Sequence, residues 1–575
     1  MSKTVAEVFV GTLKMAGVER VYGVPGDSLN AFTESIRAME GIDWVGTRNE
    51  EVAAFAAGAE SQISGKLAVC AGSCGPGNLH LINGLHDCHR SRTPVLAIAA
   101  QIPSAEIGTG YFQETHPEHL FRTCSHFCEV VSTPEQIPRV LAIAMRTAIA
   151  MRGVAVIIIP GDIAEKKCES EPIALGIDGP AAMVTPSEGE LQRAAEILNE
   201  SKTVTILAGI GCAGAREEAM QIAAVLQAPM VVSLRGKEAL EAENQYFVGL
   251  NGLLGMTSGY RAMEKCETLL MLGTDFPYAQ FYPEKAKVIQ IDVRGEQIGR
   301  RRSVDLGLIG AVRSTVQALL PLLKQPRDAT WLTESREHYT KARETLDEMA
   351  MPGDAEKKVV HPQYLMKCVS EAAAANAIFT CDVGTPTSWA ARYLDLGRTR
   401  RLLGSFVHGS MASALPQAIG AQCTHAGRQV VSLSGDGGLS MLMGDMLSLR
   451  QLKLPVKIVL FNNNSYSFVE QEMKAAGIVT YGTELVNPDF AKVASAMGMF
   501  GVRVETPEQI KPALAEAFAH EGPALVEVLV NRQELAMPPT VTAGQAVGFN
   551  LYMMKAILSG SGEEVVDMAK TNLWR

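Results

Sequence analysis

The stretch RQVVSLSGDGGLSMLMGDMLSLRQLKLPVKIVLFNNNSYSF, residues 428–468, decides the fold of this chain. It contains two short apolar runs, RQVVSLS and VKIVLF, and a helix-length segment at 439–452 lies between them. Their lengths and the flanking glycines predict a strand, a helix and a second strand. Such a unit forms two parallel strands joined by a right-handed crossover. We therefore expect Asp436 and Asn463 to emerge together at the carboxyl edge of a sheet, where open α/β sheets bind ligands.

These two side chains and the neighbouring glycines have the chemistry of a magnesium–diphosphate site. A carboxylate and an amide oxygen suit Mg²⁺, which takes its other ligands from phosphate and water. Gly437 and Gly438 let backbone N–H groups approach a phosphate, and the start of the following helix favours negative charge. The alternative is that GDG and NN are ordinary turn sequences, as either would be alone. Their position after neighbouring strands favours the magnesium–diphosphate interpretation.

Length and composition place this stretch in a larger protein of three or four domains. The chain has 575 residues, too many for one core, and 47% of them are hydrophobic. A net charge of −10 argues against non-specific binding of nucleic acid. No apolar run approaches the roughly 18 residues of a membrane span, and no secretory signal opens the chain. The 11 cysteines lack the spacing of a zinc site, which predicts buried small side chains in a reducing cytoplasm.

Alternating helix and strand patterns predict an α/β fold with three doubly wound, parallel-sheet domains and a C-terminal amphipathic tail. We expect domains at 1–182, 183–334 and 335–530, and the tail at 531–575. A charged segment at 326–360 is predicted to be a helical linker.

In the first domain, Glu50 follows a predicted strand and opens a helix. A carboxylate is favoured at the start of a helix, so its position alone predicts that Glu50 is a helix-capping acid. The glycine-rich segment AGSCGPGNLHLINGLHDC, at 71–88, could bring a cofactor close to the backbone. Metal binding by nearby histidines is an alternative, although no zinc-site spacing accompanies them; these histidines are His80, His86 and His89.

The second domain opens with a strand that runs into the glycines Gly209, Gly211 and Gly214. This spacing is a dinucleotide fingerprint, which is weak evidence when it stands alone. The acid expected about 20 residues later to hold a ribose is absent. Arg235 stands there instead, so NAD is disfavoured and a phosphate-bearing ligand such as NADP or FAD remains open.

The tail ends in a predicted amphipathic helix. Val565, Met568, Ala569 and Leu573 fall on one face, with charged residues elsewhere. The helix could dock on its own protein, or it could lie reversibly on a membrane surface with Trp574 at the interface.

The GDG and NN motifs, separated by residues 438–461, resemble the diphosphate-binding signature of thiamine-diphosphate-dependent enzymes. The chain is similar nearly end to end to bacterial pyruvate oxidases and pyruvate:quinone oxidoreductases within that family. The resemblance implies a pyrimidine-binding first domain, an FAD-binding second domain and a diphosphate-binding third domain.

The resemblance also assigns the thiamine-diphosphate and Mg²⁺ contacts. In it, the carboxyl group of Glu50 faces the cofactor's aminopyrimidine and protonates its ring nitrogen, while Met411 lies beneath the thiazolium ring and bends the cofactor. The implied thiamine-diphosphate residues are Glu50, Gly409, Ser410, Met411, Asp436, Gly437, Gly438, Asn463, Asn464, Ser465, Tyr466, Ser467, Phe468 and Val469. The implied metal ligands are Asp436, Asn463 and Ser465, the last through its backbone oxygen.

The substrate side of the implied site comes from two segments. Phe112 and Gln113 border the reactive carbon in similar enzymes, Glu472 faces the substrate, and Phe468 assists electron transfer to the flavin. The implied FAD residues are Gly209, Gly211, Arg235, Asn251, Gly252, Leu253, Leu254, Thr274, Asp275, Phe276, Pro277, Tyr278 and Asp292.

The chain departs from the family pattern at four places. Asn49 replaces a histidine and cannot titrate near neutrality, which removes any acid–base role of that position. Tyr466-Ser467 stands in place of Leu-Gly beside the reactive centre. Near the flavin contacts, Arg294-Gly295 replaces Asn-Pro and Gly310-Ala311 replaces Gly-Asp.

The resemblance implies oxidation of pyruvate to acetate and CO₂, with electrons passing through FAD to a membrane quinone. Alternatives are an acetolactate synthase that holds FAD structurally, a pyruvate oxidase that uses phosphate and O₂ to make acetyl phosphate, and an inactive or regulatory paralogue. The expected partners are phospholipid, bound by the tail, and further copies of the chain in a homotetramer of two dimers. We expect a cytoplasmic protein attached peripherally to the inner face of the membrane.

Overall fold

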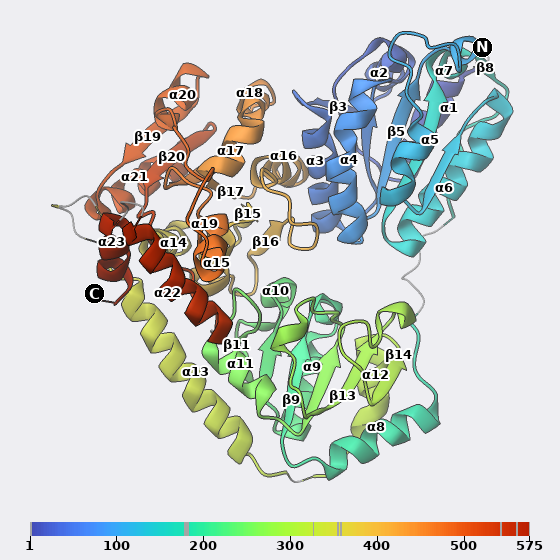
Figure 1. The fold of residues 1–575 in the computed structure, drawn as a ribbon. Helices are drawn as coiled ribbons and strands as arrows, with labels where there is room; N and C mark the ends of the chain where they lie inside the picture. The colour runs from blue at the N-terminus through green and yellow to red at the C-terminus, as the bar shows by residue number, and fades with distance from the viewer. Residues whose placement is uncertain are drawn as a thin grey trace.

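The computed structural model describes residues 3–176, 183–325, 327–353, 356, 359–540, 543–558 and 562–573. Three six-stranded sheets organise these residues, and every pairing within them is parallel (Figure 1). Helices cover both faces of each sheet, so the predicted α/β fold with three doubly wound domains is confirmed. The exact domain boundaries remain a prediction.

The first sheet has its strands in the order β3 (Asp43–Gly46), β2 (Arg20–Gly23), β4 (Ala68–Gly72), β5 (Val95–Gln101), β7 (Val154–Pro160) and β6 (Phe127–Val130). Its helices are α1 (Val5–Met15), α2 (Asn30–Ala38), α3 (Glu50–Ser64), α4 (Pro76–Arg90), α5 (Pro117–Leu120), α6 (Ile137–Met151) and α7 (Gly161–Glu165). A short antiparallel pair, β1 (Lys3–Thr4) with β8 (Lys167–Cys168), joins the two ends of this domain.

The second sheet has the order β11 (Phe247–Leu250), β10 (Met230–Val232), β9 (Val204–Ala208), β12 (Thr268–Leu272), β13 (Lys287–Asp292) and β14 (Leu306–Ile309). Its helices are α8 (Glu188–Glu200), α9 (Arg216–Leu226), α10 (Lys237–Leu240), α11 (Thr257–Glu264) and α12 (Val312–Leu319). Numbered along the domain, the order is 3-2-1-4-5-6, which is the dinucleotide-binding arrangement. Its ligand position lies where the order reverses, between β9 and β12.

The third sheet has the order β16 (Arg401–Gly404), β15 (Ile378–Cys381), β17 (Val430–Gly435), β18 (Lys457–Asn462), β20 (Ala524–Leu529) and β19 (Phe500–Val504). Its helices are α14 (Pro362–Ala372), α15 (Thr385–Tyr393), α16 (Ala414–Thr424), α17 (Asp436–Leu442), α18 (Met446–Gln451), α19 (Ser467–Ala475), α20 (Phe490–Ala496) and α21 (Pro507–Ala519). Numbered along each domain, the first and third sheets share the order 2-1-3-4-6-5. The predicted helical linker before the third domain is α13 (Thr330–Met349).

The stretch at 428–468 folds as predicted except in its helix. β17 and β18 pair in parallel, as expected. The helix between them begins at Asp436, three residues before the predicted start, and a 3₁₀ turn at Met443–Asp445 divides it into α17 and α18. Asp445 explains the break, because its carboxylate accepts hydrogen bonds from the Ser448 hydroxyl and from the backbone N–H of Arg48 in the first domain.

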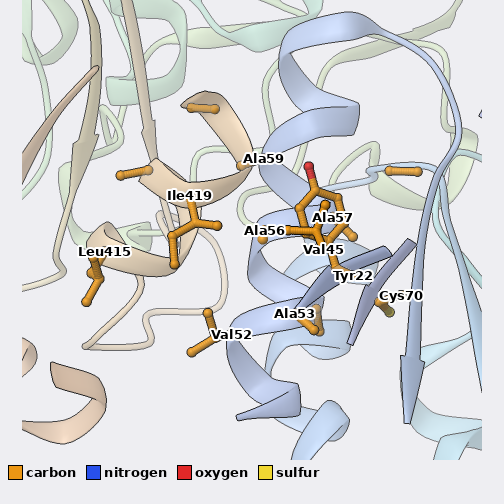
Figure 2. Packing of buried hydrophobic residues seen from close by; sticks show 14 of the residues in the cluster. Tyr22, Val45, Val52, Ala53, Ala56, Ala57, Ala59, Cys70, Leu415 and Ile419 are labelled. Carbon is orange, nitrogen blue, oxygen red and sulfur yellow. The ribbon is translucent and has the colours of Figure 1, made fainter. Parts of the chain in front are cut away.

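Helices α3 and α16 hold the first and third domains together through small side chains (Figure 2). Val52 and Ala56 of α3 lie on the side toward Ile419 of α16, whereas Ala53 and Ala57 lie toward Tyr22 of the first sheet. The backbones approach so closely that a Cβ on Gly420 would lie 2.1 Å from the carbonyl oxygen of Ala56. Only glycine fits there without movement of a helix, so the contact fixes the two domains relative to each other.

The tail forms two helices, α22 (Ala543–Leu558) and α23 (Gly562–Leu573), beside α19 (Figure 1). Met568 is buried with Tyr552 and Ala556, and Val565 packs partly buried against them, so α23 docks on its own protein in this structure. Trp574 lies outside the described residues, as does the side chain of Leu573. No described helix is long and apolar enough to cross a membrane.

Candidate functional site

At the carboxyl edge of the third sheet, Asp436 lies against the asparagine turn, as predicted. Backbone N–H groups of Gly437 and Asn464 face its carboxylate, and burial, the largest influence, raises its pKa to about 6. The amide of Asn487 donates to Asp436 Oδ2 at 2.7 Å and to Asn462 Oδ1 at 3.0 Å. Asn487 thus links the ends of β17 and β18. No local sequence pattern predicted this role.

The remaining predicted metal ligands form a tight turn. The side-chain oxygen of Asn463 accepts a hydrogen bond from the backbone N–H of Ser465 at 3.1 Å, and its amide nitrogen donates to Ser467 at 2.9 Å. The buried hydroxyl of Ser465 has no hydrogen-bond partner. One buried carboxylate, amide oxygens and an unsatisfied hydroxyl at a single sheet edge fit Mg²⁺ with a diphosphate.

The two glycines after Asp436 are needed because other predicted site residues press against them. A Cβ on Gly437 would lie 2.4 Å from the ring of Tyr466 and 3.3 Å from the terminal methyl of Met411. A Cβ on Gly438 would lie 2.3 Å from Asp382 Oδ2. The structure therefore brings Met411, Tyr466 and the GDG turn together, although the predicted reason for the glycines was phosphate access alone.

Asp382 is a site residue that the sequence reasoning missed. It is fully buried at the end of β15, and burial raises its pKa to about 7. Its Oδ1 accepts from the backbone N–H of Ala414 at 2.9 Å, while Oδ2 has no partner. The signal was available, because an acid that follows β15 must reach the same sheet edge as Asp436, which follows β17.

Glu50 opens α3, and the neighbouring residues explain its setting. Asn49 caps the helix by accepting a hydrogen bond from the backbone N–H of Glu51 at 2.8 Å, so this departure from the family pattern has a structural role. Glu50 Oε2 lies 3.0 Å from Nδ1 of His80. Within the described residues, no hydrogen bond or ion pair joins Glu50 to Asp436 or Asn463 in the same chain.

The predicted substrate-side residues lie on two separate segments. Phe112 is 79% exposed, and Gln113 has a φ of 63° and accepts a hydrogen bond from the thiol of Cys74 at 3.3 Å. Phe468 and Glu472 lie on α19, where partial burial raises the pKa of Glu472. Among the described side chains, no hydrogen bond or ion pair joins the two segments within one chain.

The predicted flavin residues gather where the central sheet reverses its strand order. Gly209 and Gly211 follow β9, and Gly273 and Thr274 follow β12. A Cβ on Gly211 would lie 2.6 Å from the Cα of Gly273, and the Gly211 N–H donates to the Gly273 carbonyl at 2.9 Å. The fingerprint glycines thus pack the two turns against each other, and the Gly211 N–H is already used for that purpose.

The two longer predicted flavin segments are neighbours in space. A Cβ on Gly252 would lie 2.8 Å from the ring of Phe276, and Tyr278 packs edge-on to the same ring. The side-chain oxygen of Asn251 is buried and has no hydrogen-bond partner. An unsatisfied amide oxygen beside an aromatic pair fits a ligand that stacks and donates a hydrogen bond, so this edge fits a dinucleotide.

Asp292 reaches the same edge, but its carboxylate is engaged. Arg294, which replaces the usual asparagine, contacts Asp292 at 3.3 Å and Asp275 at 3.5 Å. Partly buried Arg235 donates to the backbone carbonyl of Ser91 in the first domain at 3.2 Å. A ribose hydroxyl would therefore share Asp292 with Arg294, whereas guanidinium groups nearby suit the ligand's phosphates.

Metal binding by the glycine-loop histidines finds no support. The described residues contain no group of three His, Cys, Asp or Glu side chains that could hold a metal. His80 contacts Glu50, His86 stacks on His408, and His89 packs against His126. All 11 cysteines are free thiols, and most are buried, as predicted.

Sequence profiles of thiamine pyrophosphate enzymes match the chain in three places. The N-terminal TPP binding domain matches residues 3–120, the central domain 191–319 and the C-terminal TPP binding domain 382–528. A Bacillus subtilis protein, provisionally described as thiamine pyrophosphate-containing, is 35% identical over 99% of both chains. Pyruvate oxidase of Lactiplantibacillus plantarum is 28% identical, over 91% of this chain and 87% of its own. The acetolactate synthase isozyme 2 large subunit of Escherichia coli is 29% identical, over 93% of this chain and 96% of its own.

Proposed function

Because the chain belongs to the thiamine pyrophosphate enzymes, we propose that it oxidises pyruvate to acetate and CO₂ and passes the electrons through FAD to a membrane quinone. The pyruvate oxidase among its relatives supports pyruvate as the substrate. Thiamine diphosphate is the cofactor of the family; Mg²⁺ and FAD are part of the proposal.

The observation that carries the redox proposal is the proximity of the predicted flavin edge to α19. Tyr278, from the flavin segment of the central domain, lies close enough to Glu472 for the carboxylate to raise the tyrosine's pKa, although burial is the larger cause. Arg392 of the third domain also donates to the carbonyl of Leu254 at 3.3 Å. A flavin at this edge would lie beside the helix that carries Phe468 and Glu472, within reach of electrons from the substrate.

The chain's own residues have distinct roles in this proposal. Bound thiamine diphosphate supplies a nucleophilic carbon and an electron sink for the decarboxylated substrate. Asp436 and Asn463 would hold Mg²⁺ and hence the diphosphate, and Met411, whose methyl lies beside Gly437, would support the thiazolium ring. The carboxyl group of Glu50 holds the proton that the pyrimidine ring nitrogen requires.

The other predicted site residues face the substrate. Gln113 and Glu472 would orient pyruvate, Phe112 would border the reactive carbon, and Phe468 would assist electron transfer to the flavin. Among the described residues, no hydrogen bond or ion pair joins Glu50 or Gln113 to the Asp436 edge within one chain, which supports a site completed by a second copy. We therefore retain a homotetramer of two dimers, with each site shared between two subunits.

Membrane attachment is proposed on a different helix from the one first expected. α22 exposes an apolar stripe at helical spacing, formed by Val547, Leu551, Met554 and Leu558. Such a stripe suits the surface of a phospholipid membrane, where the quinone resides, and implies a cytoplasmic protein attached to the inner face.

Deleting residues 553–575 tests the membrane proposal. The deletion removes half of the α22 stripe, so sedimentation with phospholipid vesicles should fall to background. Vesicle binding equal to that of the full chain would contradict it.

Acetolactate synthesis is the second candidate, because a synthase of that kind matches nearly the whole chain. It would use the same thiamine site and hold FAD without reducing it. A third candidate, oxidation with phosphate and O₂ to acetyl phosphate, would need neither quinone nor membrane.

Product analysis separates these candidates. The purified protein is incubated with pyruvate, Mg²⁺, thiamine diphosphate and a soluble quinone analogue, with and without phospholipid. Acetate formed in proportion to reduced quinone is the expected result. Acetolactate as the main product, or acetyl phosphate formed only with phosphate and O₂, would replace the proposal with the corresponding alternative.

A further inference from the structure

One face of α4 contacts both halves of the proposed thiamine machinery. His80, Asn83 and Asp87 lie three and four residues apart, which places them along the same side of the helix; we call them the α4 face. α4 is locked against α3, since a Cβ on Gly84 would lie 2.5 Å from the side chain of Ala54. The helix is therefore a rigid base for whatever this face holds.

The first contact of the α4 face is with the start of α3. Nδ1 of His80 lies 3.0 Å from the carboxylate of Glu50. The amide of Asn83 donates to Glu51 Oε1 at 2.7 Å. The α4 face thus holds the two carboxylates that open α3.

The second contact is with residues 405–411, which we call the Met411 loop. The same Asn83 amide nitrogen donates to the hydroxyl of Ser410 at 2.9 Å, and its oxygen faces Nε2 of His408 at 2.9 Å. The ring of His408 also stacks on His86, one turn further along α4, with centroids 5.6 Å apart. One side chain of α4 therefore bridges the start of α3 and the Met411 loop.

The third contact fixes the loop from inside. Ser405 is fully buried; its hydroxyl donates to Asp87 Oδ1 at 2.8 Å and accepts from the Ser410 N–H at 3.0 Å. The Ser405 carbonyl accepts from the N–H of Gly409 at 2.7 Å. Burial raises the pKa of Asp87 to about 6, and the hydrogen bond from Ser405 opposes that rise. Asp87 is therefore buried despite the desolvation of its carboxyl group, and the hydrogen bond that it accepts from Ser405 fixes the conformation of the Met411 loop.

The loop needs such support because its backbone is strained. Ala412, next to Met411, has a φ of 61°, a region that residues with a Cβ rarely adopt. A strained segment keeps its shape only when its surroundings over-determine it. The methyl of Met411 lies over Gly437, so a shift of the loop would move the support beneath the cofactor.

We propose that the α4 face positions both Glu50 and the Met411 loop of its own chain, so that the acid and the ring support each keep the geometry needed at the shared site to which they contribute. The proposal rests on the roles that the proposed function gives to these two groups. His80, Asn83, Asp87 and Ser405 are positioning residues and do not themselves act on the cofactor.

Exchange of the thiazolium C2 proton of bound thiamine diphosphate tests the proposal, because it measures cofactor activation without pyruvate or flavin. Ser405→Ala removes the hydroxyl that joins Asp87 to the loop. We expect the affinity of this variant for Mg²⁺–thiamine diphosphate to stay within a fewfold of that of the unmodified protein. The proton should exchange more slowly by on the order of ten- to hundredfold, because small misplacements of reacting groups reduce rates by such factors. An unchanged exchange rate at full cofactor occupancy would overturn the proposal.

Further variants separate positioning from general stability. Ser201→Ala removes another buried hydroxyl, one in the central domain that bonds to Thr268 and the Ile197 carbonyl, and should leave exchange unchanged. Asp87→Asn keeps an oxygen that can accept from Ser405, so it should retain most of the exchange rate that Asp87→Ala loses. If Ser405→Ala does not fold, Asn83→Ala replaces it as the test. Asn83 is partly exposed and bridges Glu51 and Ser410, so its loss should slow C2 proton exchange in the same way.

Failure of this proposal and failure of the proposed function are distinguishable. A protein that makes acetolactate from pyruvate would still require the α4 face for C2 exchange. Conversely, normal exchange in Ser405→Ala would leave pyruvate oxidation untouched.

Discussion

Two buried acids, Asp436 and Asp382, dominate the third sheet edge at the scale of single residues. Burial raises the pKa of the first to about 6 and of the second to about 7. Ionised carboxylates are costly in such surroundings unless charge is compensated, and a bound metal ion supplies that compensation. The site is therefore expected to gain more from Mg²⁺ than an exposed carboxylate would.

The first prediction concerns the pH dependence of cofactor binding. Because the pKa of Asp436 is raised to about 6, this group carries a proton below that pH, and Mg²⁺ must displace the proton to bind. The affinity for Mg²⁺–thiamine diphosphate, measured by titration calorimetry, should be constant above pH 7. Below pH 6 it should weaken by about tenfold per pH unit, as expected for one displaced proton.

Asp382→Asn is the control for this titration, since it removes the other raised pKa of the edge. The variant should keep the inflection near the pKa of Asp436. An inflection that vanishes in Asp382→Asn would assign the pH dependence to Asp382 instead.

The second prediction is that Glu50→Gln slows pyruvate turnover by roughly 10²- to 10⁴-fold, the usual contribution of a general acid–base group. Glutamine keeps the size of the side chain but cannot hold the transferred proton. Steady-state kinetics at saturating cofactor measures the effect. Glu334→Gln, on the exposed side of α13, should be indistinguishable from the unmodified protein, and a near-normal rate in Glu50→Gln would reject its role.

At the scale of elements, the tail and α19 behave as one unit. Lys474 of α19 is almost fully buried, contacts Glu564 of α23 at 3.0 Å and lies over the ring of Tyr552 in α22. Lys555 donates to the carbonyl of Gly477 at 2.9 Å. The helix that carries Phe468 and Glu472 is thus held in part by the tail.

The third prediction is that Gly548→Ala loosens the tail. A Cβ at this position would lie 2.2 Å from the carbonyl oxygen of Ala475, so α22 must move away from α19. Limited proteolysis should cleave the variant near the start of α22 faster than the unmodified protein. Gly562→Ala, where a Cβ meets nothing within 4 Å, should show no change, and equal cleavage of all three proteins would contradict the docking.

Sequence patterns predicted the strands and helices better than they predicted which side chains form hydrogen bonds or ion pairs with one another. Apolar runs and glycine turns placed the two strands of the 428–468 stretch within one or two residues of β17 and β18. The break in the helix after Asp436 was not predictable, since it depends on a hydrogen bond between Asp445 and Arg48, 397 residues away in sequence. The same holds for Asn487 and for the pairing of Arg294 with Asp292, which only the folded chain brings together.

At the scale of the whole molecule, three sheets divide the chemistry. The first and third share one strand order and pack through α3 and α16, whereas the central sheet has the dinucleotide order. The family resemblance predicted separate pyrimidine-, FAD- and diphosphate-binding domains. The alternation of helices and strands alone predicted three α/β domains without assigning a ligand to each. The central domain contacts the third through Arg392 and the first through Arg235, so the predicted flavin edge faces both.

The fourth and most direct test is the redox state of the flavin when pyruvate is added without oxygen. The protein, loaded with Mg²⁺, thiamine diphosphate and FAD, is mixed with pyruvate under anaerobic conditions, and the flavin absorbance is followed. The account predicts that the oxidised flavin bleaches and that one acetate forms for each flavin reduced. Flavin that stays oxidised while pyruvate is consumed would contradict it and would leave thiamine chemistry without electron transfer.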